Sequence, residues 1–373
     1  MFASFMESFS VLPDPRVHLN KVRHKLLDVV TMTVCAVISG ADDWVTIVDY
    51  SRAKQEWLSS FLELPNGIPS HDTFSRLFSL IDPDAFGECF LYWVSSIATV
   101  SDGRVVPIDG KTLRRSHDGD LGTALHVVSA FCTENRLVLG QVATQEKSNE
   151  ITAIPKLLDV LDVDGAIVTI DAMGAQKAIV DKILDKGADY VIGLKGNQSN
   201  LLDFVEEQFV GVHLDTETTE RRDAHVIDDN DHGRKRIQGT FVIRATSDTP
   251  GFDEWPGLRS FILVITETID KNGRLNTERR YYISSMQPNA KESARAVRSH
   301  WHIENSLHWV LDVGFREDDS RVRRDNGAQN LAVIRHAALN LLRQDKVTKL
   351  GVKNKRKKCG YDNDYLASLL FAD

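Results

Sequence analysis

Cysteine is scarce in this sequence, with four residues among 373, and none of them stands in a C-x-x-C pair. The wide spacing of these cysteines excludes a disulfide framework and a zinc knuckle. They are Cys35, Cys89, Cys132 and Cys359. Long apolar runs are also missing, because the longest, 26–41, is interrupted by Asp28 and falls short of the roughly 20 residues that a membrane span needs. Residues 1–7 show no basic region before an apolar stretch, so we expect no secretory signal. A cytoplasmic protein is the simplest interpretation.

The chain has no excess of positive charge, with 45 Lys and Arg against 53 Asp and Glu and a net charge of −8. Its cations are nevertheless segregated, since the interval from Lys346 to Lys358 holds seven of them and no acid. Net charge says nothing about such local patches. With 42% hydrophobic and 26% charged residues the composition is that of a globular protein, and the length predicts two or three structural units.

The hydrophobic pattern changes along the chain. Apolar residues at three- and four-residue spacing predict an all-helical domain over 1–98, in which Ser70 caps a helix. From 99 to 345 the pattern predicts a mixed sheet flanked by helices, an α/β (α+β mixed) fold class. A β-rich insertion is expected over about 210–279, with its acidic stretch 215–231 as a solvated loop. The basic residues after 345 are interpreted as a C-terminal extension over 346–373.

Two aspartates stand where predicted strands end. Asp109 follows the run 105–108, and Asp171 closes the run 166–170, which is apolar throughout and therefore predicts a strand buried on both faces. Open α/β sheets bind ligands at this carboxyl edge. An isolated Asp-Gly more often caps a turn, but two acids on neighbouring strands repel each other unless a cation lies between them.

A third acid, Glu304, lies on a late predicted helix. His300, Glu304 and His308 have i, i+4 and i+8 spacing, which predicts one helical face. Three interpretations compete for this face: a solvated or salt-bridged surface, a zinc site that uses both histidines, and a carboxylate that completes a three-acid metal site. The zinc motif with a recognised mechanism, H-E-x-x-H, is absent. Carboxylates alone suit Mg²⁺ or Mn²⁺, and two such ions can activate a nucleophile and stabilise the leaving oxygen of a phosphodiester.

Runs spread over nearly the whole chain carry a family resemblance. In order they are Asp14-Pro15-Arg16, the stretch 35–44, Gly67 to Phe74, Ile108 to Lys111, Lys147 to Pro155, Thr169 to Met173, Leu194 to Gln198, His232-Gly233-Arg234, Arg280 to Ser285 and His300 to Val313. In these runs the sequence resembles the DDE transposases of H-repeat-associated bacterial insertion sequences, which have a ribonuclease-H-like catalytic core.

The resemblance implies Mg²⁺- or Mn²⁺-dependent cleavage at insertion-sequence ends and strand transfer into target DNA. It implies two ions held by Asp109, Asp171 and Glu304, double-stranded DNA as the partner, a homodimer in the synaptic complex and a cytoplasmic, nucleoid-associated location. Two alternatives are a non-catalytic DNA-binding remnant of a mobile element and a plain nuclease of the same fold. Glu317 is a rival for the third acid.

One departure from the wider group concerns its Tyr-Arg-Glu-Lys signature around the glutamate, because Val297, His300 and Leu311 occupy the Tyr, Arg and Lys positions here. Residues near this helix, lysines that follow strands, and the basic runs of the insertion and of the C-terminal segment are candidates for contacting DNA phosphates. They are Lys111, Lys195, Arg234, Lys235, Arg236, Arg298, His300, His308, Lys355, Arg356, Lys357 and Lys358.

Overall fold

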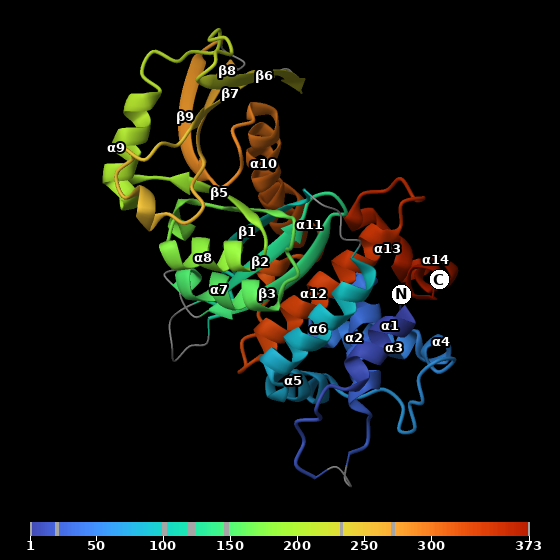
Figure 1. Cartoon of the computed structure of the whole chain (residues 1–373). Helices are drawn as coiled ribbons and strands as arrows, with labels where there is room; N and C mark the ends of the chain where they lie inside the picture. Colours follow the sequence, from blue (N-terminus) through green and yellow to red (C-terminus); the bar gives the residue numbers. More distant parts are fainter. Residues whose placement is uncertain are drawn as a thin grey trace. The chain divides into compact units, whose positions relative to one another are not determined.

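The computed structural model describes residues 2–18, 22–98, 103–117, 124–144, 149–231, 234–269 and 273–371 (Figure 1). The chain divides into two compact units. Unit 1 comprises 1–99, 110–149 and 304–373, and unit 2 comprises 100–109 and 150–303. Strand β1 (Val105–Thr112) begins in unit 2 and ends in unit 1. Together the units form a mixed α/β protein, which confirms the predicted fold class.

Unit 1 is mainly helical. Its elements are α1 (Phe2–Ser10), α2 (Leu26–Ile38), α3 (Trp44–Ala53), α4 (Gln55–Leu58), α5 (His71–Leu80), α6 (Pro83–Ile97), β2 (His126–Cys132), β3 (Leu137–Thr144), the π-helical turn η6 (Glu304–His308), α11 (Trp309–Phe315), the 3₁₀ turn η7 (Glu317–Asp319), α12 (Gly327–Gln344), α13 (Val352–Tyr361) and α14 (Asn363–Phe371). The last residues of β1 lie beside β2, which forms an antiparallel hairpin with β3.

Two apolar helices form the core of unit 1. All residues of α2 except Thr31, Thr33 and Asp28 are apolar, and α2 packs against α12, which also contacts α5, α6 and β3. Asparagines on α12 tie it to its neighbours: the Asn330 side chain donates to the Phe78 and Ile81 carbonyls, and Asn340 bonds both backbone groups of Val138. Ser70 caps α5 by accepting from the Thr73 N–H, as the sequence predicted.

Unit 2 is built on a sheet. Its elements are α7 (Glu150–Val160), β4 (Ile167–Ile170), η3 (Ala172–Gly174), α8 (Lys177–Asp185), β5 (Asp189–Leu194), η4 (Gly196–Gln198), α9 (Ser199–Gln208), β6 (Arg222–Asp231), β7 (Arg234–Arg244), η5 (Phe252–Glu254), β8 (Ser260–Ile269), β9 (Leu275–Ser284) and α10 (Ala290–Ile303). The strand order is β1-β4-β5-β9-β8-β7-β6, with β1, β4 and β5 parallel and the later strands antiparallel.

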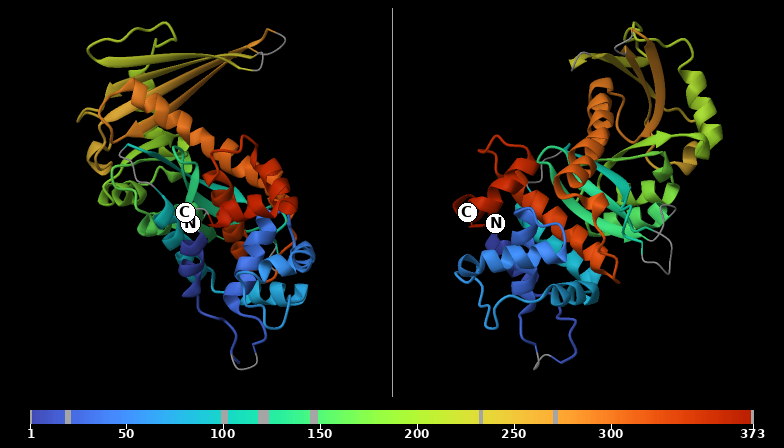
Figure 2. Two further views of the ribbon diagram at one scale, coloured as in Figure 1. Left: turned by 90° about the vertical axis from the view of Figure 1, so that its right-hand side faces the viewer. Right: turned by 180° about the vertical axis from the view of Figure 1, so that it is seen from behind.

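Strand β4 lies in the middle of the parallel part, and all four of its residues are buried. This agrees with the apolar run that predicted it, because a strand covered on both faces needs no polar alternation. Helix α8 packs against β5, and α10 packs along β4 to β8 (Figure 2). The first part of β1 and the whole of β4 thereby lie side by side in the sheet of unit 2.

The acidic stretch 215–231 is not a loop throughout, which corrects the prediction. Residues 222–231 form β6, which pairs along its length with β7. Ordered contacts explain this strand despite its acids: the Asp223 carboxylate accepts from the Ala290 N–H at 2.7 Å, and Asp229 pairs with Arg298 at 2.7 Å. Both acids therefore bind α10 and do not face only solvent.

The C-terminal segment after 345 is folded, since it forms α13 and α14. Helix α13 packs against α2, α11 and α12, and α14 against α1, α12 and α13. Within the described residues, no helix combines the length and apolar character that crossing a membrane requires.

Candidate active site

The two aspartates lie on neighbouring strands, although β1 continues past Asp109 to Thr112, so Asp109 does not follow the end of its strand as predicted, whereas Asp171 does follow β4. In the parallel pairing of β1 with β4, Ile108 stands opposite Ile170. Asp109 and Asp171 are the next residues of the two strands, and both side chains are partly exposed. Because paired strands are about 4.8 Å apart, their carboxylates begin from adjacent backbone positions at the same edge of the sheet. The register thus brings together two acids that are far apart in the sequence.

The turn after Asp171 is held by its own hydrogen bonds and by the segment after β5. Asp171 Oδ1 accepts from the Met173 N–H at 2.9 Å and so caps the short turn η3. The Asn197 amide donates to the Ala172 carbonyl at 2.8 Å, and Gln198 donates to the Ala175 carbonyl at 2.9 Å. These contacts assign a positioning role to the run 194–198.

Gly193 on β5 allows a close approach beside Asp171. A Cβ atom at this position would lie 3.2 Å from the Ala172 nitrogen and 3.6 Å from the Asp171 carbonyl carbon. Such a contact with backbone is tight, because the backbone cannot move aside as a flexible side chain can. The packing of the turn therefore favours glycine at Gly193.

His300 ties α10 to the same strand end. Its Nδ1 shares a hydrogen bond with Thr169 Oγ1 at 3.1 Å, and Thr169 precedes Asp171 by two residues on β4. Burial lowers the pKa of His300, and the negative charge of Asp171 opposes that shift. A neutral imidazole in this place is a hydrogen-bonding group, which distinguishes His300 from a permanently charged phosphate ligand.

Glu304 begins the π-helical turn η6 directly after α10, and its side chain is exposed. Although i, i+4 and i+8 spacing predicted one face for His300, Glu304 and His308, the structure gives Glu304 and His308 different surroundings. His308 is buried, at 9% exposure, whereas Glu304 faces solvent. His308 is therefore not placed to contact DNA. π-Helical turns are frequent at functional sites.

Among the residues that the structure describes, no three histidine, cysteine or acidic side chains gather into a ready-made metal site. Asp109 and Asp171 form a pair within unit 2, and Glu304 belongs to unit 1. The donor chemistry of the pair fits Mg²⁺ or Mn²⁺, because both prefer carboxylate oxygens and retain waters at a partly exposed site.

Lys111 is engaged in a buried ion-pair cluster, which contradicts its predicted contact with DNA. Its ammonium contacts Asp312, Glu317 at 2.8 Å and Asp318 at 3.5 Å. Burial alone would lower the pKa of Lys111, but the carboxylates of Glu317 and Asp312 together outweigh burial and the pKa is raised. Glu317 is 3% exposed and also faces Arg335 at 3.6 Å. Since its charge is already neutralised in the interior, Glu317 is a structural acid and a poor rival to Glu304.

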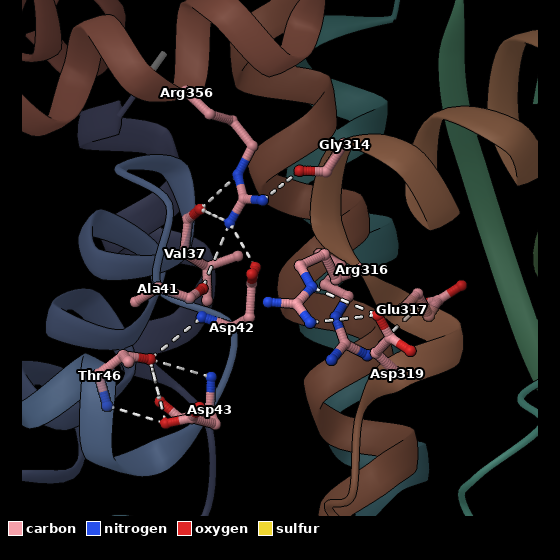
Figure 3. A network of polar contacts seen from close by, with 11 residues as sticks. Val37, Ala41, Asp42, Asp43, Thr46, Gly314, Arg316, Glu317, Asp319 and Arg356 are labelled. Carbon is pink, nitrogen blue, oxygen red and sulfur yellow. Dashed lines mark hydrogen bonds and ion pairs between the residues drawn. The ribbon is translucent and has the colours of Figure 1, made fainter.

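Arg356 and Lys355 are also wrong as predicted DNA contacts, because both side chains are buried. Figure 3 shows the Arg356 guanidinium between the end of α2 and the end of α11. It donates to the carbonyls of Val37, Ala41 and Gly314 and pairs with Asp42 at 3.0 Å. Lys355 donates to the Asp345 carbonyl at 2.6 Å. Arg356 thus joins the C-terminal end of α2 and the loop after it to the end of α11.

The other candidate cations differ in their availability. Lys195 and Arg236 are exposed, whereas Arg298 is paired with Asp229. Lys357 is exposed, and Lys358 lies over the Tyr365 ring at 4.2 Å. The side chains of Arg234 and Lys235 lie outside the described residues.

Sequence reasoning missed the supporting residues of the site, which are Thr169, Gly193, Asn197 and Gln198. The signal that could have found Asn197 and Gln198 is their position directly after a strand adjacent to β4, where side-chain amides can bond a neighbouring turn. Nothing in the local pattern around Thr169 indicates its bond to a histidine 131 residues away.

Two family models match the chain, "DDE_Tnp_1-associated" over residues 6–94 and "Transposase DDE domain" over 100–341. The "H repeat-associated putative transposase YhhI" of Escherichia coli strain K12 is 44% identical over 370 residues, 98% of this chain and 97% of that protein. The "Putative transposase YncI" of Escherichia coli O157:H7 is 45% identical over 372 residues, 98% of this chain and 94% of that protein.

A shorter relative, the "Inactive transposase YbfQ" of Escherichia coli strain K12, is 45% identical over 74 residues, 20% of this chain and 87% of that protein. A solved structure with a TM-score of 0.41 and 10% identity, covering 99% of this chain and 77% of the other, is titled "Cryo-EM structure of piggyBac transposase synaptic complex with hairpin DNA (SNHP)". With a transposase domain model over more than half of its length and relatives above 40% identity along nearly all of it, the chain belongs to the DDE transposase family of H-repeat-associated elements.

Proposed function

We propose that this protein cleaves DNA at the ends of an insertion sequence and joins the freed 3′ ends to target DNA. The observation that carries the proposal is the β1–β4 register, in which Asp109 and Asp171 directly follow the paired residues Ile108 and Ile170. Family membership supports the reaction type. The proposal includes Glu304 as the third acid and duplex DNA as the substrate.

In this proposal Asp109, Asp171 and Glu304 hold Mg²⁺ or Mn²⁺, which would activate the attacking oxygen and stabilise the leaving oxygen when bound. The chain's own residues orient these acids. The Thr169–His300 bond fixes α10 against β4, and Asn197 and Gln198 fix the turn that follows Asp171. The exposed Lys195 follows β5 and would contact a phosphate as a point charge.

The test uses duplex DNA that carries the terminal inverted repeats flanking the coding region, with Mg²⁺ or Mn²⁺. Asp109→Asn, Asp171→Asn and Glu304→Gln should each lower the cleavage rate by about a thousandfold or more, since metal-ligating acids supply several kcal/mol to the transition state. DNA affinity should change little. Glu292→Gln is the matched control, because Glu292 lies in the first turn of α10 and bonds Arg295.

The outcomes separate the alternatives. Retained cleavage by Asp109→Asn or Asp171→Asn would refute the site. Cleavage by the unmodified protein without strand joining would indicate a plain nuclease. DNA binding without cleavage, under conditions where a related transposase is active, would indicate a remnant that has lost its chemistry.

A further inference from the structure

Unit 1 contains a groove of about 510 Å³ that has no part in the candidate active site. Its walls come from the starts of α3 and α5 and from the segment between η7 and α12. The lining residues are Asp43, Trp44, Val45, His71, Asp72, Ser75, Arg321, Val322, Arg323, Arg324 and Gly327. We call this feature the arginine groove.

Three exposed arginines define one wall of the arginine groove. Arg321 and Arg323 flank Val322, which is 9% exposed. Gly327 makes room for this anchor, because a Cβ atom there would lie 3.1 Å from Val322 Cγ1. Val322 is thus buried beside Gly327, whereas Arg321 and Arg323 on either side of it are exposed.

The guanidinium groups keep donors for a ligand. Arg323 uses Nε to bond the Arg115 carbonyl at 2.8 Å, and Arg324 lies 3.5 Å from Asp325 in a pair that is more than 60% exposed on both sides. Exposed pairs of this kind are weak. Within the described ranges no ion pair is found for Arg321. A guanidinium carries five N–H donors, so each arginine can still bind an anion.

The other wall of the arginine groove can also accept a negatively charged ligand. Two helices, α3 and α5, begin here, and helix N-termini favour anions. The acid Asp43 is occupied in a capping box with Thr46, accepting from its N–H at 2.9 Å. Trp44 packs on Phe78 at 5.0 Å and provides a rigid side. The three arginines outnumber the two acids of the lining, one of which is used as a cap.

We propose that the arginine groove binds the phosphate backbone of duplex DNA at a position separate from the cleaved bond. The inference rests on the proposed function, because the partner is the DNA of that reaction. Arg321 and Arg323 are two residues apart, so their backbone positions are separated by at most about 7 Å, a spacing that suits consecutive phosphates on one strand. Guanidinium groups match phosphate geometry by bidentate bonding. The groove holds DNA without reading its sequence.

The test measures duplex affinity of the full chain by fluorescence anisotropy over a salt series in EDTA, so that no cleavage occurs. The triple variant Arg321→Gln, Arg323→Gln, Arg324→Gln should lower affinity at least about tenfold and reduce the slope of log affinity against log salt by about 2 to 3, since each phosphate contributes about 0.9. The affinity should fall by the same factor for duplexes that carry the terminal repeats and for unrelated duplexes.

The matched control replaces three exposed cations of the same unit outside the groove, Arg23→Gln, Lys25→Gln and Arg52→Gln, and should leave the slope unchanged. Replacing the three groove arginines by lysine should restore most of the slope, which excludes misfolding as the cause. Two results would show that the arginine groove is not a DNA site. In the first, the groove glutamine variant binds DNA like the unmodified protein. In the second, the groove glutamine variant and the control glutamine variant lose the same amount of affinity and slope. Absence of duplex binding by the unmodified protein would instead refute the proposed function.

Discussion

At the scale of single residues, the candidate site depends on small packing details around Asp171. The carboxylate is fixed by the turn η3, and this turn lies against the backbone of Gly193 on β5. A displacement of about 1 Å in a catalytic group can cost about a hundredfold in rate. In the proposed reaction, residues around Asp171 would therefore control the cleavage rate through the position of its carboxylate.

We predict that Gly193→Ala lowers the cleavage rate about tenfold to a hundredfold, because the new Cβ would press on the Ala172 nitrogen at 3.2 Å and move the turn after Asp171. Cleavage kinetics measure this effect, and circular dichroism checks the fold. Gly196→Ala is the control, since a Cβ there meets nothing within 4 Å. Equal rates for the two variants would mean that the turn accommodates the methyl group.

At the scale of elements, the sequence predicted the strands that carry the two acids, and it placed Asp171 correctly after β4 but ended β1 too early, at Ile108. The apolar run before Asp171 has only one good interpretation, which is a central strand. Because the ends of parallel strands meet at one edge of a sheet, the two acids could be expected near each other. Two other elements could not be predicted. The π-helical turn η6 leaves no hydrophobic signature, and β6 carries acids whose partners on α10 are distant in sequence.

Helices α13 and α14 were missed for a different reason. The dense cations of 346–358 are typical of a solvated surface, but the methylene stems and donors of Lys355 and Arg356 are used in the interior of unit 1. Charge pattern alone cannot distinguish a phosphate-binding arm from an arginine that bonds the carbonyl ends of two helices.

We predict that Asp223→Ala loosens the start of α10, because its carboxylate accepts from the Ala290 N–H at 2.7 Å. Loss of a comparable capping bond costs about 1 kcal/mol, or about fivefold in local opening. Hydrogen–deuterium exchange of the peptide that begins α10 measures the change. The control is Asp228→Ala, an exposed acid on the other face of β6. Unchanged exchange in the Asp223 variant would show that this contact is not needed to fix the helix.

At the scale of the whole molecule, the buried charges of unit 1 link distant parts of the chain. Lys111 comes from the end of β1, Glu317 from η7 and Arg335 from α12, so their ion pairs join three segments. Burial would raise the pKa of Glu317, but Lys111 and Arg335 lower it. The stability that Glu317 contributes is therefore present above its unfolded pKa of about 4.5 and is lost only in more acidic solution.

His336 belongs to the same cluster. It should dominate the pH dependence of the free energy of unfolding in less acidic solution than that in which Glu317 is protonated. Burial lowers its pKa from 6.5 to about 4, so the folded protein binds fewer protons than the unfolded chain between these values. The free energy of unfolding should consequently fall by about 3 kcal/mol as the pH is lowered from 6.5 to 4. Urea denaturation at several pH values measures this slope. His336→Leu should remove most of it, because the variant has no group to protonate there, whereas His71→Gln, at an exposed position, should retain it. If the leucine variant loses stability with acid as steeply as the unmodified protein, another buried group carries the pH dependence.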